Sequence, residues 1–200
     1  AGGALDHYTK LHEELGRSEA ELEGLRQRLE TAEKLESTKA QLDIERARLS
    51  KALQDDIHER AEIVRSAILT FEELSESLYE RAGSLTISDS HGGLTFDVRI
   101  DGQRSKGITN MQIFCFDLML AEISTRQGRG PGFLIHDSHL FDGVDERQVA
   151  KALQLGAERA ERVGFQYIVT INSDALPRDG FTDGFDVGSY VLRTKLTDIT

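Results

Sequence analysis

Acidic side chains follow a short apolar segment in the second half of the chain. Residues 133–137 read Phe-Leu-Ile-His-Asp, so the apolar run ends in the carboxylate of Asp137, and Asp142 and Asp145 come soon after it. In open parallel sheets, ligands bind beyond the carboxyl ends of the strands, and Mg²⁺ takes carboxylate oxygens as ligands. This is the pattern of a Walker B strand, and it predicts that Asp137 holds the Mg²⁺ of a bound nucleotide.

The phosphate-binding half of such a site is missing from the sequence. No Gly-x-x-x-x-Gly-Lys-Ser/Thr segment, whose backbone N–H groups would cradle phosphates, occurs in the 200 residues. The chain by itself is therefore expected to be inactive. ATP and Mg²⁺ are expected as cofactors only where a P-loop from another segment completes the site.

A second group of residues could contact an anion. Ser105, Lys106 and Gly107 stand at the start of an expected helix. Free backbone N–H groups at a helix N-terminus attract anions, and a hydroxyl and an ammonium add to that attraction. Serine is also a common N-cap, so the same residues fit a purely structural helix start.

Two histidines and two acids lie near the same point of the sequence. His136, Asp137, His139 and Asp142 have the ligand types of a hydrolytic metal site, which would make the chain a metal-dependent hydrolase or nuclease. Strand geometry argues against this alternative. Adjacent strand residues point to opposite faces, so His136 and Asp137 could not share a metal without a bend.

The elements that would position these residues alternate between strand and helix. Two short apolar segments, 133–135 and 167–171, are typical of strands covered on both faces, and residues 145–163 between them have an amphipathic helical pattern. This order predicts a parallel crossover. Residues 106–124 place apolar side chains at helical spacing on a wide face, which predicts a largely buried helix.

Strands of another kind are expected at the edges of this sheet. Residues 94–101 alternate between apolar and polar side chains, which is typical of a half-buried antiparallel strand. A last strand over residues 187–196 is expected to close the sheet edge.

The first part of the chain has the composition of a long exposed helix. Residues 11–79 contain no proline and are rich in Glu, Arg, Lys, Ala and Leu, and Gly83 is expected to end the helix. One narrow coiled-coil seam is predicted from Leu22, Leu25, Leu29, Ala32, Leu35, Leu42 and Leu49. A second coiled-coil helix is therefore expected, from the same polypeptide or from another copy of the chain. The sequence divides into a coiled-coil arm, residues 1–55, and an α/β lobe, residues 56–200.

Composition limits the class of protein. The chain has 38% apolar and 30% charged residues, which is ordinary for a soluble protein. Its apolar runs are shorter than a membrane span, and its single cysteine, Cys115, falls in an apolar helical pattern, so a reducing cytoplasm and no membrane are expected. The net charge of −11 comes without a basic stripe, so composition predicts no nucleic-acid surface.

The order of these segments resembles the C-terminal half of an ABC-type ATPase head of the RecF, RecN and SMC kind. Residues 105–107 look like the signature segment, 133–137 like Walker B, 144–145 like the D-loop and 166–172 like the strand before the switch residue. Residues 133–148 and 170–174 look more narrowly like a YydD-like bacterial group. Its members carry an N-terminal P-loop, a coiled-coil middle and a C-terminal domain of unknown function.

The resemblance implies a fold and a mechanism. A coiled-coil arm would join the C-terminal lobe of a P-loop ATPase head, with parallel core strands and antiparallel edge strands, and the N-terminal P-loop lobe of the same protein would be its partner. Two such heads would form a homodimer that binds ATP and hydrolyses it slowly, and work on DNA, in repair or defence, is implied by the resemblance alone. Nucleotide contacts would come from Ser105, Lys106, Gly107, Asp145 and Asn172.

Three features depart from these ATPases. Ser138 follows the Walker B acid, where a glutamate normally positions the attacking water, and Asn172 stands where a histidine is usual. The segment between Walker B and the D-loop is also longer. Catalytic residues are therefore expected among Ser138, His139, Asp142 and Glu146. A lobe without hydrolysis would instead serve as a non-catalytic dimerisation or adaptor module.

Overall fold

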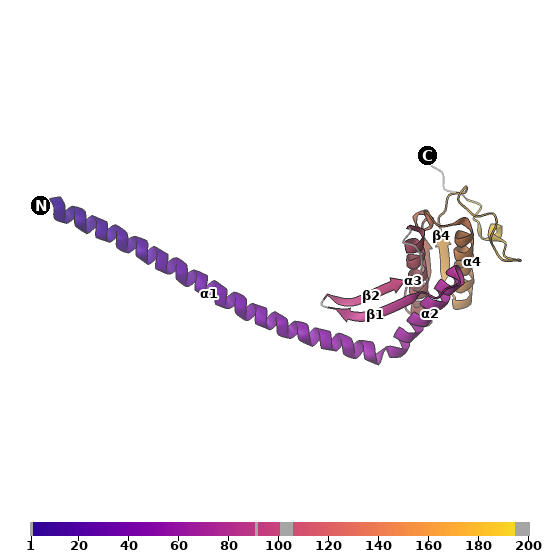
Figure 1. The fold of residues 1–200 in the computed structure, drawn as a ribbon, viewed down its shortest axis with the longest axis horizontal. Helices are drawn as coiled ribbons and strands as arrows, with labels where there is room; N and C mark the ends of the chain where they lie inside the picture. The colour runs from indigo at the N-terminus through magenta and orange to yellow at the C-terminus, as the bar shows by residue number, and fades with distance from the viewer. Residues whose placement is uncertain (1, 91, 101–105, 195–200) are drawn as a thin grey trace. The chain divides into compact units, whose positions relative to one another are not determined.

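The computed structural model describes residues 2–90, 92–100 and 106–194. The chain divides into two compact units, Ala1–Asp55 and Asp56–Thr200 (Figure 1). Within the described ranges, helices combine with two small sheets of two strands each into a mixed α and β structure. None of the helices in these ranges has both the length and the apolar content that crossing a membrane requires.

One long helix, α1 (Gly2–Glu59), fills the first unit and continues into the second. Its residues are mostly good helix formers and include no proline, so nothing interrupts the backbone hydrogen bonds. The predicted long helix is confirmed, whereas its pairing into a coiled coil stays a prediction. The seam leucines are at least half exposed, from 50% for Leu22 to 70% for Leu35.

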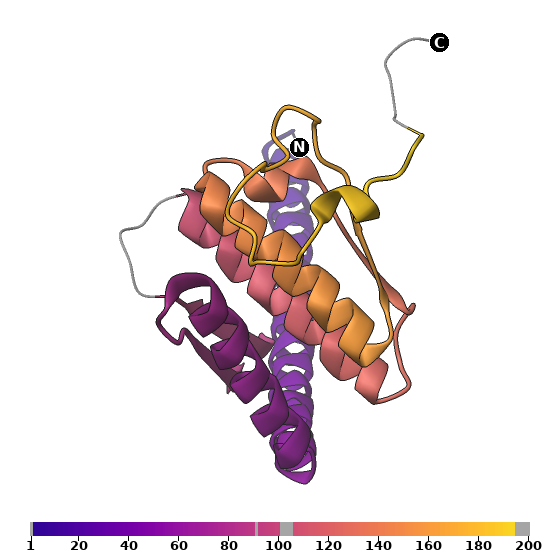
Figure 2. The same ribbon diagram turned by 90° about the vertical axis from the view of Figure 1, so that its right-hand side faces the viewer.

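The second unit contains α2 (Ala61–Tyr79), which follows α1 after a break at Arg60. Its apolar side chains recur every three or four residues, so one face of the helix is buried. This face packs against two later helices, α3 (Lys106–Arg126) and α4 (Glu146–Val163) (Figure 2). Its buried residues are Ala67, Thr70, Phe71, Leu74, Ser75 and Leu78.

The end of α2 differs from the expectation. Glu80 has a left-handed conformation with φ 58°, and its N–H donates to the carbonyl of Glu76, so the helix ends at Tyr79 and not at Gly83. Gly83 is needed for close packing instead. An added Cβ at this position would lie 2.7 Å from the carbonyl oxygen of Arg99.

An antiparallel hairpin follows, formed by β1 (Ser84–Ser90) and β2 (Gly93–Arg99). The alternation that predicts β2 is confirmed. The sequence does not predict β1, because Leu85 and Ile87 are its only large apolar residues. In the described part of the chain the hairpin pairs with no further strand, so the prediction of antiparallel strands at the edge of the parallel sheet is wrong.

The predicted buried helix is confirmed as α3 (Lys106–Arg126). Burial raises the pKa of the Cys115 thiol to about 12, so the thiol stays protonated and packs as an apolar group. The expected helix start at Ser105 lies outside the described residues. The apolar side chains of α3 that are at most 1% exposed are Met111, Phe114, Cys115, Leu118 and Met119.

The predicted strand–helix–strand unit is confirmed as β3 (Phe133–His136), α4 (Glu146–Val163) and β4 (Gln166–Val169). The two strands are parallel, and Leu134 lies opposite Tyr167. Each strand is short, and β4 ends at Val169, before the end of the predicted segment 167–171.

Helices cover one face of this parallel pair (Figure 2). Strand side chains alternate between faces, so Leu134 and His136 point inward, and His136 is 5% exposed. On the opposite face, Phe133 is 46% and Ile135 is 53% exposed. Parallel sheets are usually covered on both faces, whereas the described residues cover one face of this pair.

The segment after β4, which is drawn in gold in Figure 2, crosses over α4. Gln154 on α4 holds it, because the N–H of Thr182 donates to Oε1 of Gln154 at 3.0 Å. The predicted strand at 187–196 is wrong in its described part. Residues Val187–Tyr190 form the short 3-10 helix η2, since the carboxylate of Asp186 accepts a backbone N–H two residues further on and starts a turn.

Candidate functional site

Asp137 stands directly after β3, where the chain enters the 3-10 helix η1 (Ser138–Phe141). Its Oδ1 accepts the N–H of His139 at 2.9 Å, so the carboxylate caps η1. The side chain is exposed, and an ionised carboxylate has lone pairs for further contacts. Mg²⁺ commonly takes one or two carboxylates and completes its shell with water and phosphate, so a single exposed carboxylate fits this metal.

Polar contacts join the start of α3 to the residues around η1. Nζ of Lys106 lies 3.1 Å from Oδ2 of Asp142. Nδ2 of Asn110 donates to the carbonyls of His139, at 3.2 Å, and of Asp142, at 3.0 Å. Lys106, an expected nucleotide contact, and Asp142, an expected catalytic residue, therefore lie together at one corner of the lobe.

Backbone packing fixes the same corner. Gly107 is buried, and an added Cβ would overlap the carbonyl oxygen of Gly143 and lie 3.2 Å from Cα of Val144. Only glycine allows so close an approach. Ser105, the remaining residue of the predicted anion site, lies outside the described residues.

The other predicted residues lie on separate turns nearby. Asp145 caps α4, with its Oδ1 accepting the N–H of Arg147 at 3.0 Å, and Glu146 is exposed in the first turn, where an acid complements the helix dipole. Ser138 is half-buried at the start of η1. Asn172 is exposed after β4, and its carbonyl accepts the N–H of Ala175 at 3.0 Å.

His136 is buried at the end of β3 among aromatic rings. Its Nδ1 lies 3.1 Å from the hydroxyl of Tyr167, and its ring centroid is 5.5 Å from those of Phe114 and Tyr167. Nε2 has no hydrogen-bond partner among the described residues, and Oδ2 of Asp117 is 3.5 Å away. Burial, helped by the charge of Asp117, raises the pKa of Tyr167, so its hydroxyl keeps a proton to donate to the imidazole.

The predicted hydrolytic metal cluster does not assemble. Among the residues that the structure describes, no group of three or more His, Cys, Asp or Glu side chains could hold a metal ion together. His136 turns into the core, Asp137 turns toward η1, and Asp142 pairs with Lys106. Strand alternation separates the first two, so the prediction of this cluster is wrong.

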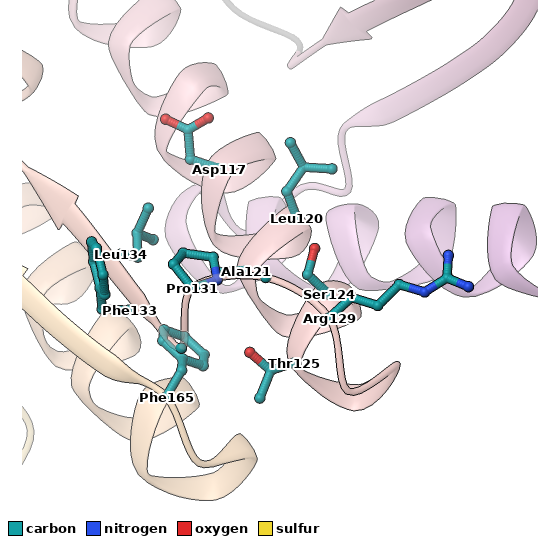
Figure 3. A pocket seen from close by; sticks show the side chains of 12 residues that line it. Asp117, Leu120, Ala121, Ser124, Thr125, Arg129, Pro131, Phe133, Leu134 and Phe165 are labelled. Carbon is teal, nitrogen blue, oxygen red and sulfur yellow. The ribbon is translucent and has the colours of Figure 1, made fainter.

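Two open clefts lie along the junction of α3 and β3. The cleft at the start of β3 is mainly apolar, and Figure 3 shows Pro131 and Phe165 beside this end of the strand. The cleft at the carboxyl end of β3 contains predicted site residues. It is lined by Asn110, Ile113, Ile135, His136, Asp137, His139 and Leu140.

Sequence reasoning missed three side chains of this region. Asn110 follows Lys106 by four residues and therefore shares its helix face, a signal that could have identified it. Asp117 and Tyr167 come from α3 and β4 and meet His136 through the fold alone, so no local spacing marks them.

Residues 74–200 match a family described as an uncharacterised protein conserved in bacteria. This range holds every residue of the candidate site. The chain belongs to the DUF2326 family. The DUF2326 match begins within α2, so α1 lies outside it. No curated protein matches the sequence of this DUF2326 chain.

Among solved structures, this DUF2326 chain is similar to the crystal structure of the SmcHead bound to the C-winged helix domain of ScpA. The TM-score is 0.41 and the sequence identity is 15%. The match covers 56% of this chain and 36% of the solved one. The DUF2326 chain thus spans well under two thirds of the length of that structure.

Proposed function

We propose that the chain is the C-terminal lobe of an SMC-like or RecN-like ATPase, which binds ATP and Mg²⁺ together with a P-loop lobe. The observation that carries the proposal is the exposed carboxylate of Asp137 at the carboxyl end of β3, in a cleft that Asn110, four residues into α3, also lines. Ligands bind at this end of parallel strands, and helix N-termini favour phosphate. The acid and the helix together provide half of a nucleotide site.

The open side of the parallel pair supports the need for a second lobe. Within the described residues β3 has β4 as its one strand neighbour, and Phe133 and Ile135 are about half exposed. Burying a large apolar side chain contributes about 1.5–3 kcal/mol. A P-loop lobe whose helices pack on this face would cover these side chains, and a strand of the same lobe beside β3 would bring phosphate-binding N–H groups close to Asp137.

The proposed roles follow from the positions of the residues. Asp137 would hold Mg²⁺ within its own head, and Lys106 and Gly107, together with Ser105, would meet the γ-phosphate of ATP held by the opposite head. The side chains of Lys106 and Asp142 are 67% and 49% exposed. An exposed ion pair contributes at most about 1 kcal/mol, so Lys106 can exchange Asp142 for a phosphate at little cost.

Hydrolysis in this proposal is slow, because Ser138 occupies the position of the usual glutamate. His139 lines the same cleft as Asp137 and is therefore our choice for the group that accepts a proton from water. Asp142 is paired with Lys106, and Glu146 belongs to α4. Asp145 and Asn172 would contact nucleotide across the head interface, and an action on DNA is part of the proposal through family resemblance alone.

The test uses the purified chain with and without the P-loop lobe that the proposal requires. We expect no ATP turnover from the chain alone and Mg²⁺-dependent turnover from the mixture. Asp137→Asn should lower turnover by at least about tenfold, because the metal loses an anionic ligand. Glu161→Gln, which removes an exposed acid from α4, should leave turnover unchanged.

Each other outcome identifies a different function. Turnover by the chain alone that is lost in Asp137→Asn would indicate a self-contained hydrolase. Equal turnover by Asp137→Asn and the unmodified chain would remove the assigned role of Asp137. Association of the two lobes without turnover would identify a non-catalytic adaptor.

A further inference from the structure

A row of side chains on α3 faces the two clefts beside β3. Asp117 and Leu120 line the cleft at the start of the strand, and Ile113 lines the cleft at its carboxyl end. Leu120 is 42% and Ile113 is 46% exposed. The row therefore places one carboxylate between two open apolar side chains.

Both clefts lie toward the edge of β3 that β4 leaves free. Their linings come from α3, β3 and nearby loops and turns, whereas α4 packs on β4. The N–H of Gln166 donates to the carbonyl of Gly132 at 2.9 Å. Backbone groups alternate in direction along a strand, so those of Phe133 and Ile135 point away from β4. An added strand would pair with these groups and would turn every second side chain toward α3.

The carboxylate of Asp117 lacks a close cation among the described residues. Its side chain is 37% exposed, and Oδ2 lies 3.5 Å from Nε2 of His136, a nitrogen without a hydrogen-bond partner in this part of the chain. Nδ1 of His136 accepts the proton of the Tyr167 hydroxyl, which leaves the imidazole neutral. Arg129 lines the same cleft, but Figure 3 shows its guanidinium pointing away from Asp117. A strand that covered Asp117 without supplying a cation would bury an unpaired charge, which is costly.

The spacing of the row matches that of a strand. Ile113 precedes Asp117 by four residues, about 6 Å along a helix, and Leu120 follows it by three residues, about 4.5 Å. Side chains on one face of a strand are about 6.6 Å apart. Three successive inward side chains of an added strand would therefore meet Ile113, Asp117 and Leu120 in turn.

We propose that Asp117 selects the strand that binds this edge by pairing with a basic side chain of that strand. The basic residue lies between two apolar residues, each two positions away, and these contact Ile113 and Leu120. This inference rests on the proposed function, because it specifies the strand by which the P-loop lobe joins β3. It identifies a sequence pattern that the partner lobe must contain, apolar-x-basic-x-apolar.

Fluorescence anisotropy with labelled peptides tests the pairing without nucleotide. The peptide Thr-Leu-Thr-Arg-Thr-Leu-Thr is symmetrical, so it presents the same pattern in either strand direction, and a second peptide carries methionine in place of arginine. The unmodified chain should bind the arginine peptide about three- to tenfold more tightly, because a partly buried ion pair forms. Asp117→Asn should remove this preference, and Asp117→Arg should reverse it in favour of a peptide with glutamate at the centre.

Two further variants control for charge and location. Glu161→Gln removes an exposed acid from α4, outside both clefts, and should keep the preference for arginine. Leu120→Ser should weaken both peptides equally, since it removes an apolar contact that they share. In hydrogen exchange, the amides of Phe133 and Ile135 should become protected when the arginine peptide binds.

Equal affinities of the arginine and methionine peptides would overturn the inference. So would a preference for arginine that persists in Asp117→Asn, or binding that leaves the amides of Phe133 and Ile135 unprotected. An Asp117-dependent preference without ATP turnover by the two lobes would instead overturn the proposed function alone. Turnover at limiting lobe concentrations that Asp117→Arg leaves unchanged would overturn this inference alone.

Discussion

Gly156, within α4, lets the ring of Tyr167 lie directly against the helix. An added Cβ would overlap Cε1 of this ring and lie 2.6 Å from Cδ1. The hydroxyl of Tyr167 in turn lies 3.1 Å from Nδ1 of His136, the residue before Asp137. The missing side chain at position 156 therefore sets β4 against α4 and orients the imidazole next to the candidate metal ligand.

Gly156→Ala should destabilise the lobe by about 1–3 kcal/mol, because the ring of Tyr167 is packed and cannot move aside freely. Alanine is the better helix former, so propensity alone predicts the opposite sign. Urea denaturation followed by circular dichroism measures the difference. Gly24→Ala in α1, where nothing lies within 4 Å of an added Cβ, should stabilise its helix by about 0.5–1 kcal/mol. Stabilisation by both substitutions would contradict the packing argument.

Among the elements, three helices of the lobe are joined by a buried charge network. The side chain of Glu122 on α3 is 0% exposed, and its carboxylate lies 2.5 Å from Arg126 and 3.3 Å from both Arg159 and Arg162. Arg159 on α4 also reaches Glu73 on α2 at 3.1 Å. A carboxylate at this depth persists only when it is paired, so the network ties α2, α3 and α4 together.

Glu122→Ala should lower the free energy of unfolding by about 3–5 kcal/mol, because Arg159, whose side chain is 10% exposed, loses its buried partner. Glu73→Ala is the matched control, since it removes a 63% exposed acid from the same arginine and should cost no more than about 1 kcal/mol. Chemical denaturation at neutral pH compares the two variants. Similar losses would mean that burial does not decide the strength of this network.

The long helix α1 should associate with another copy of itself. Leu22, Leu25 and Leu29 are 50–61% exposed in the single chain, and burying each contributes about 1.5–3 kcal/mol against an association cost of about 4–15 kcal/mol. Lys39 and Arg46 interrupt the seam, so we expect a dimer with a dissociation constant on the order of micromolar. Sedimentation equilibrium at several concentrations measures it.

Substitutions in α1 distinguish pairing through the leucine seam from nonspecific hydrophobic association. Leu25→Glu together with Leu29→Glu should abolish the dimer. Ile44→Glu, at a 70% exposed position away from the seam, should leave it intact. A monomer at all concentrations with full helicity would show that the seam is covered in some other way.

At the scale of the whole molecule, one side of the β3–β4 sheet remains open. The described residues place helices on its inner face and pair β3 on one edge. Hydrogen exchange should therefore be fast for β3 amides that do not pair with β4, and the same amides should become protected when the P-loop lobe binds. Amides of residues 114–119 in α3 should stay protected in both states. Unchanged exchange in β3 upon binding would place the partner lobe elsewhere.

The fold was predictable where local pattern and tertiary environment agree. Helical spacing identifies α3 and α4, and short apolar runs identify β3 and β4. Residues 187–192 mislead, because Val187, Tyr190 and Val191 suit a strand while the Asp186 cap starts a 3-10 turn. The acid after β3 was visible in the sequence, but its surroundings were not, since Asp117 and Tyr167 reach His136 from elements far apart in the chain.

The close approach of Gly107 to Gly143 couples the start of α3 rigidly to the loop after η1. No side chain lies between the two backbone segments, so the first turn of α3 cannot move past the loop after η1 without a steric clash. A displacement of Lys106 is therefore transmitted through the packed backbone to Asp145, which caps α4. Movement at this one corner would therefore turn α3 and α4 together.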